Sequence, residues 1–353
     1  MTTIASLPDQ WRSFLNTLGV KGSVVWVHKE PITIVAGIDE AGFGPVLGPL
    51  LVCASAFSVP SSVATDSMWK SLAGTVTKKA SKKAATIAIG DSKKLYGGLK
   101  DPKGLQRLER GVLTMMRAGG KSVSNLDEFL SAVCPDAIDS RKNYKWYDQQ
   151  LTLPLQAGVN DLALMSNALS SAMVRAGISL EMLEAQTVFE GEFNNLLART
   201  NNKSTTLFDI TSRLLQRIWT KFPGRHMIIN VDRQGGRARY LPVLERIFDG
   251  CEFKIIDESE TLSAYGVRCS DTYAEIRFTV GADDQHLPVA LASMLAKYLR
   301  ELWMTLFNQW WASRVANLEP TAGYYTDGGR FYKMIAPTAQ AMGIAHDMIY
   351  RNR

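Results

Sequence analysis

Two apolar, β-rich segments, TIVAGID and PLLVCASAF, are separated by the stretch EAGFGPVLG. Segments of this kind favour buried strands, and the glycines and proline between them force the chain to turn. Asp39 and Glu40 then stand where the first strand ends. A fold that accepts this pattern has to bury both strands and still leave two adjacent carboxylates at the turn.

The remaining pattern predicts a mixed α/β chain. From Gly98 to about Pro223 the apolar spacing is mostly helical, with an excursion at CPDAIDSRKNYKWYDQQLTLPLQAG. MIINVD reads as a strand ending on Asp232, and two further strands, EFKIIDES and AEIRFTVGAD, lead to Asp283 and a long helix beginning LPVALASML. A short helix at 9–18 and a strand at 22–27 are expected to form an N-terminal appendage.

Composition narrows the class of protein. The chain has 353 residues, 46% of them hydrophobic, and a net charge of +6, which permits a polyanionic partner without requiring one. Its four cysteines are far apart in the sequence and form no C-x-x-C pair, which argues against a disulfide framework or structural zinc site and fits a reducing compartment. We interpret them as small core residues. With no leader pattern and no run of membrane-spanning length, we expect a cytoplasmic protein that does not bind membranes.

Acidic residues recur at the ends of the predicted strands: Asp39 with Glu40, Asp232 and Asp283. α/β folds place ligand sites at such positions, although an Asp after a strand also serves as an ordinary turn or helix cap. If these strand ends meet, the carboxylates repel one another unless hard cations such as Mg²⁺ or Mn²⁺ neutralise them. Two such ions roughly 3.5–4 Å apart support phosphodiester hydrolysis.

Five segments resemble, in order, the motifs of the type 2 ribonuclease H family (RNase HII/HIII-like), of which this chain would be a divergent member. They are GIDEAGFGPVLGPL, DSKKL at 91–95, INVDRQGG, ADDQHLPVALASMLAKYLREL and AGYYTDGGRFYKMIAPTAQAMGIAHDMIYRNR. Residues 34–110 and 200–353 fit the family's order. We therefore expect a type 2-like domain at 34–353, an appendage at 1–33 and an insertion at about 111–199.

The resemblance implies an α/β fold, an RNase H-like mixed sheet flanked by helices, with a helical insertion and a C-terminal helical region. It assigns catalysis and metal binding to Asp39, Glu40, Asp232 and one residue of the pair Asp283 and Asp284. Counting back from ASMLAK without a gap selects Asp283, whereas alignment on Pro288 selects Asp284. We choose Asp283.

The resemblance also implies substrate contacts: Gly42, Phe43, Gly44, Lys93, Lys94 and Tyr324. Lys93 and Lys94 would contact phosphate, and Tyr324 would pack against a sugar and read its 2′-OH; the alternatives are a solvated basic turn and an ordinary half-buried tyrosine. Phe43 stands where the family commonly has Arg, so a guanidinium that grips phosphate is lost. Arg237 or Arg239 is a hypothetical replacement.

The expected activity is metal-dependent endonucleolytic hydrolysis of the RNA strand of RNA–DNA hybrids, or of ribonucleotides embedded in duplex DNA, with 5′-phosphate products and Mg²⁺ or Mn²⁺ as cofactor. The alternative is a nucleic-acid-binding or interaction protein on the same scaffold, with reduced or redirected nuclease activity, whose insertion contacts an unknown protein partner. We expect a monomer. No P-loop motif and no G-x-G-x-x-G after a strand is present, which disfavours a nucleotide-cofactor enzyme.

Overall fold

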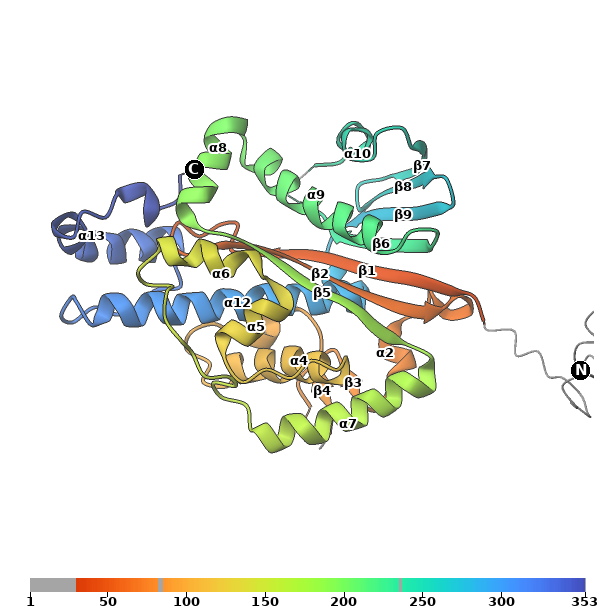
Figure 1. The fold of residues 1–353 in the computed structure, drawn as a ribbon, viewed down its shortest axis with the longest axis horizontal. Helices are drawn as coiled ribbons and strands as arrows, with labels where there is room; N and C mark the ends of the chain where they lie inside the picture. Colours follow the sequence, from red (N-terminus) through yellow and green to blue (C-terminus); the bar gives the residue numbers. More distant parts are fainter. Residues whose placement is uncertain (1–29, 82–84, 235–236, 353) are drawn as a thin grey trace, which may run out of the picture. The chain divides into compact units, whose positions relative to one another are not determined.

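The two segments beside the carboxylate pair form the antiparallel strands β1 (Ile32–Ala41) and β2 (Leu50–Pro60) of a seven-stranded sheet (Figure 1). This computed structural model describes residues 30–81, 85–234 and 237–352, so the expected helix at 9–18 and strand at 22–27 lie outside the described residues. The sheet order is β5-β2-β1-β6-β9-β8-β7. The other strands are β5 (Ser179–Val188), β6 (His226–Asp232), β7 (Glu252–Glu258), β8 (Leu262–Cys269) and β9 (Thr272–Thr279), with β3 (Val76–Thr77) and β4 (Ile87–Ala88) forming a separate pair.

The centre of the sheet is parallel, whereas both of its outer parts are antiparallel. β1 pairs with β6 and β6 with β9 in parallel, with Ile38 beside Val231 and Asp232 beside Thr279. The carboxyl ends of these three strands therefore meet at one edge of the sheet, where α/β folds place their sites.

Helices cover both faces of the sheet (Figure 1). A first core, which includes Val35 and Leu291, lies under the longer helices of one face, and a second core, which includes Ile34 and Leu214, lies under those of the other. Val35 and Ile34 point to opposite cores because side chains alternate along a strand. The main helices of the first face are α4 (Gly104–Ala118), α5 (Leu126–Val133), α7 (Val159–Ala176) and α12 (Leu287–Ala312); α9 (Lys203–Lys221) and α10 (Leu241–Ile247) cover the second. The remaining helices include α2 (Met68–Ser71), α3 (Ser92–Tyr96), α6 (Asp136–Ser140), α8 (Glu190–Thr200), α11 (Ala282–Gln285) and α13 (Tyr325–Ala341).

The expected fold class, a mixed sheet flanked by helices, is confirmed. Two strands of the seven-stranded sheet were not predicted, and neither was the short pair β3 and β4. β5 lies in the stretch read as mostly helical, and its SLEMLEAQTV sequence is rich in helix formers, so pairing with β2 at the sheet edge overrides local propensity. β8 makes three strands after β6 where we expected two, because the turns on either side of it, at 259–261 and 270–271, contain neither glycine nor proline.

The predicted insertion at about 111–199 contributes to both the sheet and the first core. It holds β5 and the whole of the excursion that interrupts the helical pattern. Within that excursion Tyr147 is fully buried, and its ring lies 5.2 Å from that of Trp303 on α12. The division into an appendage, a domain and an insertion stays a prediction. No helix in the described ranges is both long and apolar enough to cross a membrane.

Gly37 allows β1 to lie directly against the beginning of α12. A Cβ atom at Gly37 would stand 2.1 Å from the backbone nitrogen of Val289 and 2.3 Å from the carbonyl carbon of Pro288. The hydroxyl of Ser55 on β2 donates to the Pro288 carbonyl at 2.8 Å and holds the same contact. The helix is thus fixed to β1 at backbone distance and to β2 by a hydrogen bond.

We predict that Gly37→Ala lowers the free energy of unfolding by about 3 kcal/mol, because only backbone atoms stand where the methyl group must go. Urea unfolding measures the change. The matched control is Gly329→Ala in α13, where a Cβ meets nothing within 4 Å and the lost glycine flexibility should raise stability by about 0.5–1 kcal/mol. Similar small effects from both substitutions would contradict this account of the β1–α12 contact.

Candidate active site

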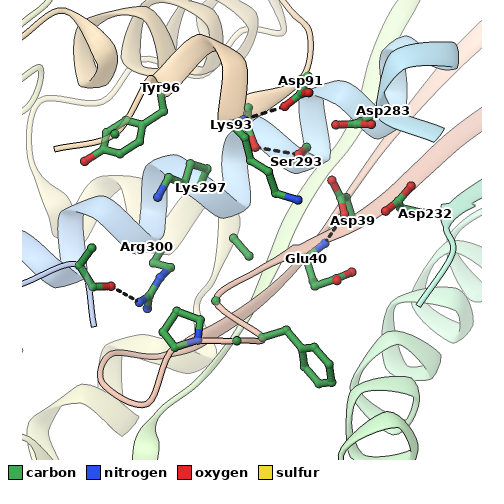
Figure 2. A pocket seen from close by; sticks show the side chains of 18 of the residues that line it. Asp39, Glu40, Asp91, Lys93, Tyr96, Asp232, Asp283, Ser293, Lys297 and Arg300 are labelled. Atoms are coloured by element: carbon green, nitrogen blue, oxygen red, sulfur yellow. Dashed lines mark hydrogen bonds between the residues drawn. The ribbon is translucent and has the colours of Figure 1, made fainter. Parts of the chain in front are cut away.

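The four acidic positions predicted from the sequence line one cavity of about 830 Å³ (Figure 2). Asp39 and Glu40 stand at the end of β1, Asp232 is the last residue of β6, and Asp283 lies in α11, just after β9. Their convergence follows from the parallel pairing of these three strands, whose carboxyl ends share an edge. Residues distant in the sequence therefore place their carboxylates around one space.

Burial raises the pKa values of all four acids, and mutual repulsion adds to it at Asp39, Glu40 and Asp283. Burial and then the charges of Glu40 and Asp232 hold the pKa of Asp39 well above its usual value. Burial and then the charge of Asp232 raise the pKa of Glu40 to about 7, with Lys93 as a partial offset. Burial and then Asp232 raise the pKa of Asp283. Ionised carboxylates are thus unfavourable here unless positive charge is supplied.

The donor set fits a hard divalent cation in type and charge. Carboxylate oxygens are the ligands that Mg²⁺ and Mn²⁺ prefer, and Oε2 of Glu40 is buried with no hydrogen-bond partner in the described part of the chain. Oδ1 of Asp232 is already in use, since it accepts the backbone N–H of Ala282 at 2.8 Å. Within residues 30–81, 85–234 and 237–352, no three acidic, histidine or cysteine side chains are arranged to hold an ion as they stand. The acids therefore share a cavity without forming a closed ligand cage.

The contacts separate Asp283 from Asp284, although both line the cavity. The carboxylate of Asp284 pairs with the ammonium group of Lys94 at 3.0 Å, and its side chain is 56% exposed. Asp283 is partly buried, and the charges of Asp232 and Asp91 act on it. The environment of Asp283 is the one shared with the other three acids.

Asp91, to which the sequence analysis gave no role, positions the basic segment of the cavity. Its Oδ1 caps α3 by accepting the backbone N–H groups of Lys93 at 2.9 Å and Lys94 at 3.2 Å. Figure 2 shows the Lys93 side chain extending toward the carboxylates, whereas the Lys94 ammonium bridges Asp91 and Asp284 and lies outside the lining. Of the two lysines, only Lys93 faces the cavity.

One polar stripe of α12 also lines the cavity and was missed. Ser293, Lys297 and Arg300 follow each other at helical spacing in the mostly apolar first half of α12, a pattern that was readable in the sequence. The Ser293 hydroxyl is 2.9 Å from that of Ser92, and the Lys297 ammonium lies 4.2 Å from the centre of the Tyr96 ring. Lys297 also pairs with Glu301 at 2.5 Å and Arg300 donates only to backbone carbonyls, so both cations are engaged.

The glycine loop between β1 and β2 is held by two buried arginines. Arg300 donates to the carbonyls of Pro49 at 3.0 Å and Leu47 at 3.1 Å. Arg351, in the C-terminal tail and only 1% exposed, donates to the carbonyls of Gly42 and Pro45. Gly42 itself has φ +86°, in the left-handed region that favours glycine. The loop is a fixed wall of the cavity. The sequence around Arg351 has no feature that predicts its contact with the loop.

The other predicted contact residues also border the cavity. Gly42, Phe43, Gly44 and Tyr324 line it, and Tyr324 is 56% exposed at the beginning of α13. The ring of Phe43 packs against the second core, with the Lys203 ammonium 5.5 Å from its centre.

The two arginines suggested as replacements for the missing guanidinium do not line this cavity. Arg237 lies over the Phe208 ring at 5.2 Å, and Arg239 is 84% exposed and 3.8 Å from Glu258.

No protein-family model matches the chain, and neither does any curated protein sequence. Among solved structures, the RNase HII of Archaeoglobus fulgidus, determined in a complex with PCNA, is similar at 15% identity and a TM-score of 0.40, over 91% of this chain and 94% of that one. Bst-RNase HIII in complex with Mn²⁺ is similar at 13% identity and a TM-score of 0.38, and the match covers 94% of this chain and 70% of that one. Ribonuclease H2 of Pyrococcus horikoshii OT3 is similar at 12% identity and a TM-score of 0.37, and the match covers 90% of this chain and 92% of that one.

These three proteins carry the names of the family that the motifs resemble.

We predict that Glu40→Gln stabilises the protein at pH 8 and has little effect at pH 5 in metal-free buffer. The pKa of Glu40 is about 7 in the folded state and 4.5 ordinarily, so the folded protein loses stability as pH rises between these values. Removing the carboxylate should raise the free energy of unfolding by on the order of 2 kcal/mol at pH 8. Thermal unfolding at the two pH values measures this. The exposed Glu245→Gln is the control, and an equal effect of Glu40→Gln at both pH values would refute the prediction.

Proposed function

We propose that the protein is a metal-dependent endonuclease that hydrolyses the RNA strand of an RNA–DNA hybrid, or a ribonucleotide embedded in duplex DNA, leaving 5′-phosphate ends. The observation that carries this proposal is the convergence of Asp39, Glu40, Asp232 and Asp283 on one cavity. The motif resemblance supports it independently, because it selected the same four positions from the sequence alone. A protein that only binds a polyanion gains nothing from four carboxylates in its groove.

Mg²⁺ or Mn²⁺ would be held by these four carboxylates, and would supply an activated water and stabilisation of the leaving 3′-oxygen. The chain's own part is to place the scissile phosphate. Lys93 is suited to this because it faces the carboxylates and has no salt bridge within the described residues. Its charge would balance a phosphate oxygen beside the acids, and the Asp91 cap keeps it there.

The walls of the cavity provide the remaining contacts. The glycine loop offers backbone at Gly42 and Gly44, and a Cβ at Gly44 would meet nothing within 4 Å, so a strand can approach closely. The exposed ring of Tyr324 can pack against a sugar, with its hydroxyl near a 2′-OH. Positioning and electrostatics carry the reaction, and no side-chain nucleophile is required.

A second candidate is a nucleic-acid-binding or interaction protein with reduced or redirected nuclease activity. Phe43 is the observation that favours it, because the ring packs against the second core and offers no charge to a phosphate. Direct assay separates the two functions.

We predict that the protein cuts the labelled RNA strand of an RNA–DNA hybrid when Mg²⁺ or Mn²⁺ is present and not when the ions are chelated. Asp39→Asn, which keeps the shape of the side chain and removes its charge, should lower the rate by roughly 10²-fold or more. Denaturing gels and end analysis report the cut and its 5′-phosphate. Equal rates for both proteins, or hybrid binding without cleavage, would favour the second candidate.

We further predict that Asp283→Asn lowers the cleavage rate by roughly 10²-fold, whereas its neighbour Asp284→Asn lowers it by less than about tenfold. Asp284 is paired with Lys94, and Asp283 faces the other acids. The two variants are matched in chemistry and adjacent in sequence, so thermal unfolding of each is a sufficient check on folding. The reverse order of effects would move the fourth ligand to Asp284.

A further inference from the structure

Two of the four cysteines face each other across neighbouring strands. Cys251 directly precedes β7, and Cys269 is the last residue of β8. The antiparallel register pairs Glu252 with Arg268. One further step along this register places Cys251 opposite Cys269. Cysteines that are far apart in the sequence are therefore cross-strand neighbours at the open end of the β7–β8 hairpin.

This placement meets the geometric requirement of a disulfide. Opposed residues of an antiparallel pair have Cα atoms about 4.5–5.5 Å apart, within the range of about 4.4–6.8 Å that disulfides span. Burial and a hydrogen bond with the Cys269 thiol raise the pKa of Cys251 to about 12. Both cysteines are free thiols, and each lies close enough to act on the other electrostatically.

Access distinguishes this pair from the other cysteines. Cys251 and Cys269 are partly exposed, so a small oxidant can reach them. Cys53 and Cys134 are buried in the first core, and the Cys134 sulfur lies 3.3 Å from the Thr187 hydroxyl. These two are the core residues that the sequence analysis expected all four to be.

We propose that Cys251 and Cys269 form a reversible disulfide that closes the β7–β8 hairpin. With glutathione disulfide as oxidant, one cysteine sulfur attacks its S–S bond and releases one glutathione thiol. The second cysteine sulfur then displaces the other glutathione, and the new S–S bond forms within the protein. Two S–H bonds of the protein are lost, and two electrons and two protons leave with the two glutathione thiols.

The disulfide would fasten an edge strand. β7 is the outermost strand and is held only by its pairing with β8 on one side. A covalent link at 251 and 269 would close the end of the hairpin opposite the loop at 259–261. Neither cysteine lines the acidic cavity, so this inference does not depend on the proposed nuclease activity.

Peptide mapping of the full chain tests the proposal. The native protein is incubated in buffers with rising ratios of glutathione disulfide to glutathione, alkylated, and digested with trypsin without reduction. Trypsin separates 247–254, which holds Cys251, from 269–277, which holds Cys269. We expect these two peptides to appear joined by a disulfide in most of the protein at the oxidising end, and to separate fully after dithiothreitol.

Cys269→Ser and Cys251→Ser are the matched controls. In each variant the remaining cysteine should still form a mixed disulfide with glutathione, and the joined peptide should not appear. If either variant does not fold, the map of the unaltered protein still decides. Three results would overturn the proposal. The first is glutathione adducts at the two positions without the joined peptide, and the second is a joined peptide that appears only after denaturation in urea. The third is a disulfide to Cys53 or Cys134.

Discussion

The backbone contact between β1 and α12 determines where the candidate site can form. Gly37 has no side chain, so the helix begins within backbone distance of the strand, and Ser55 fastens the same point from β2. β1 ends in Asp39 and Glu40, and α11 with Asp283 immediately precedes α12. One close approach therefore brings the acids of the first strand to the acid that follows β9, and it presents the polar stripe of α12 to the same cavity. A larger residue at 37 would separate these two halves of the site.

The same arrangement carries an electrostatic cost that the surrounding structure has to offset. Burial raises the pKa values of all four acids, and repulsion adds to it at Asp39, Glu40 and Asp283. Lys93 supplies part of the opposing charge, and the Ala282 N–H supplies a hydrogen bond to Asp232. The adjoining glycine loop is fixed by buried groups from three directions: Arg300 from α12, Arg351 from the tail, and Glu190, which accepts the Gly48 N–H at 3.1 Å. Many buried hydrogen bonds around the loop let the fold keep an unfavourable cluster of charges in place. Such clusters are typical of functional sites.

The roles of the four acids in catalysis and metal binding stay a prediction. The sequence did indicate that they meet, because each stands at or soon after the end of a strongly patterned strand, and parallel strands bring such ends to one edge. The sequence predicted less of the structure where an element or contact depends on residues far away in the chain. β5 has a helix-like composition and becomes a strand only by pairing with β2, and Arg351 reaches the glycine loop across more than three hundred residues. Cys251 and Cys269 became neighbours only when the unpredicted β8 returned the chain beside β7. The stripe of Ser293, Lys297 and Arg300 is different, since its helical spacing was visible and its polarity on a buried helix was the available signal.

The loop around Phe43 is held by contacts that do not involve a charge at this position. The carbonyls on either side of it, those of Gly42 and Pro45, are held by Arg351, and Gly42 keeps the left-handed conformation that the turn requires. The ring packs against the second core with the Lys203 ammonium near it, so the loop is anchored by apolar burial at the position where a charged side chain would reach outward. The loop thus forms a fixed backbone wall of the cavity, and Phe43 adds no charge to it. In the proposed function, Lys93, whose charge acts on Glu40 and Asp232, is then the cation that would meet a phosphate, and the proposal depends on that residue more than on the glycine loop.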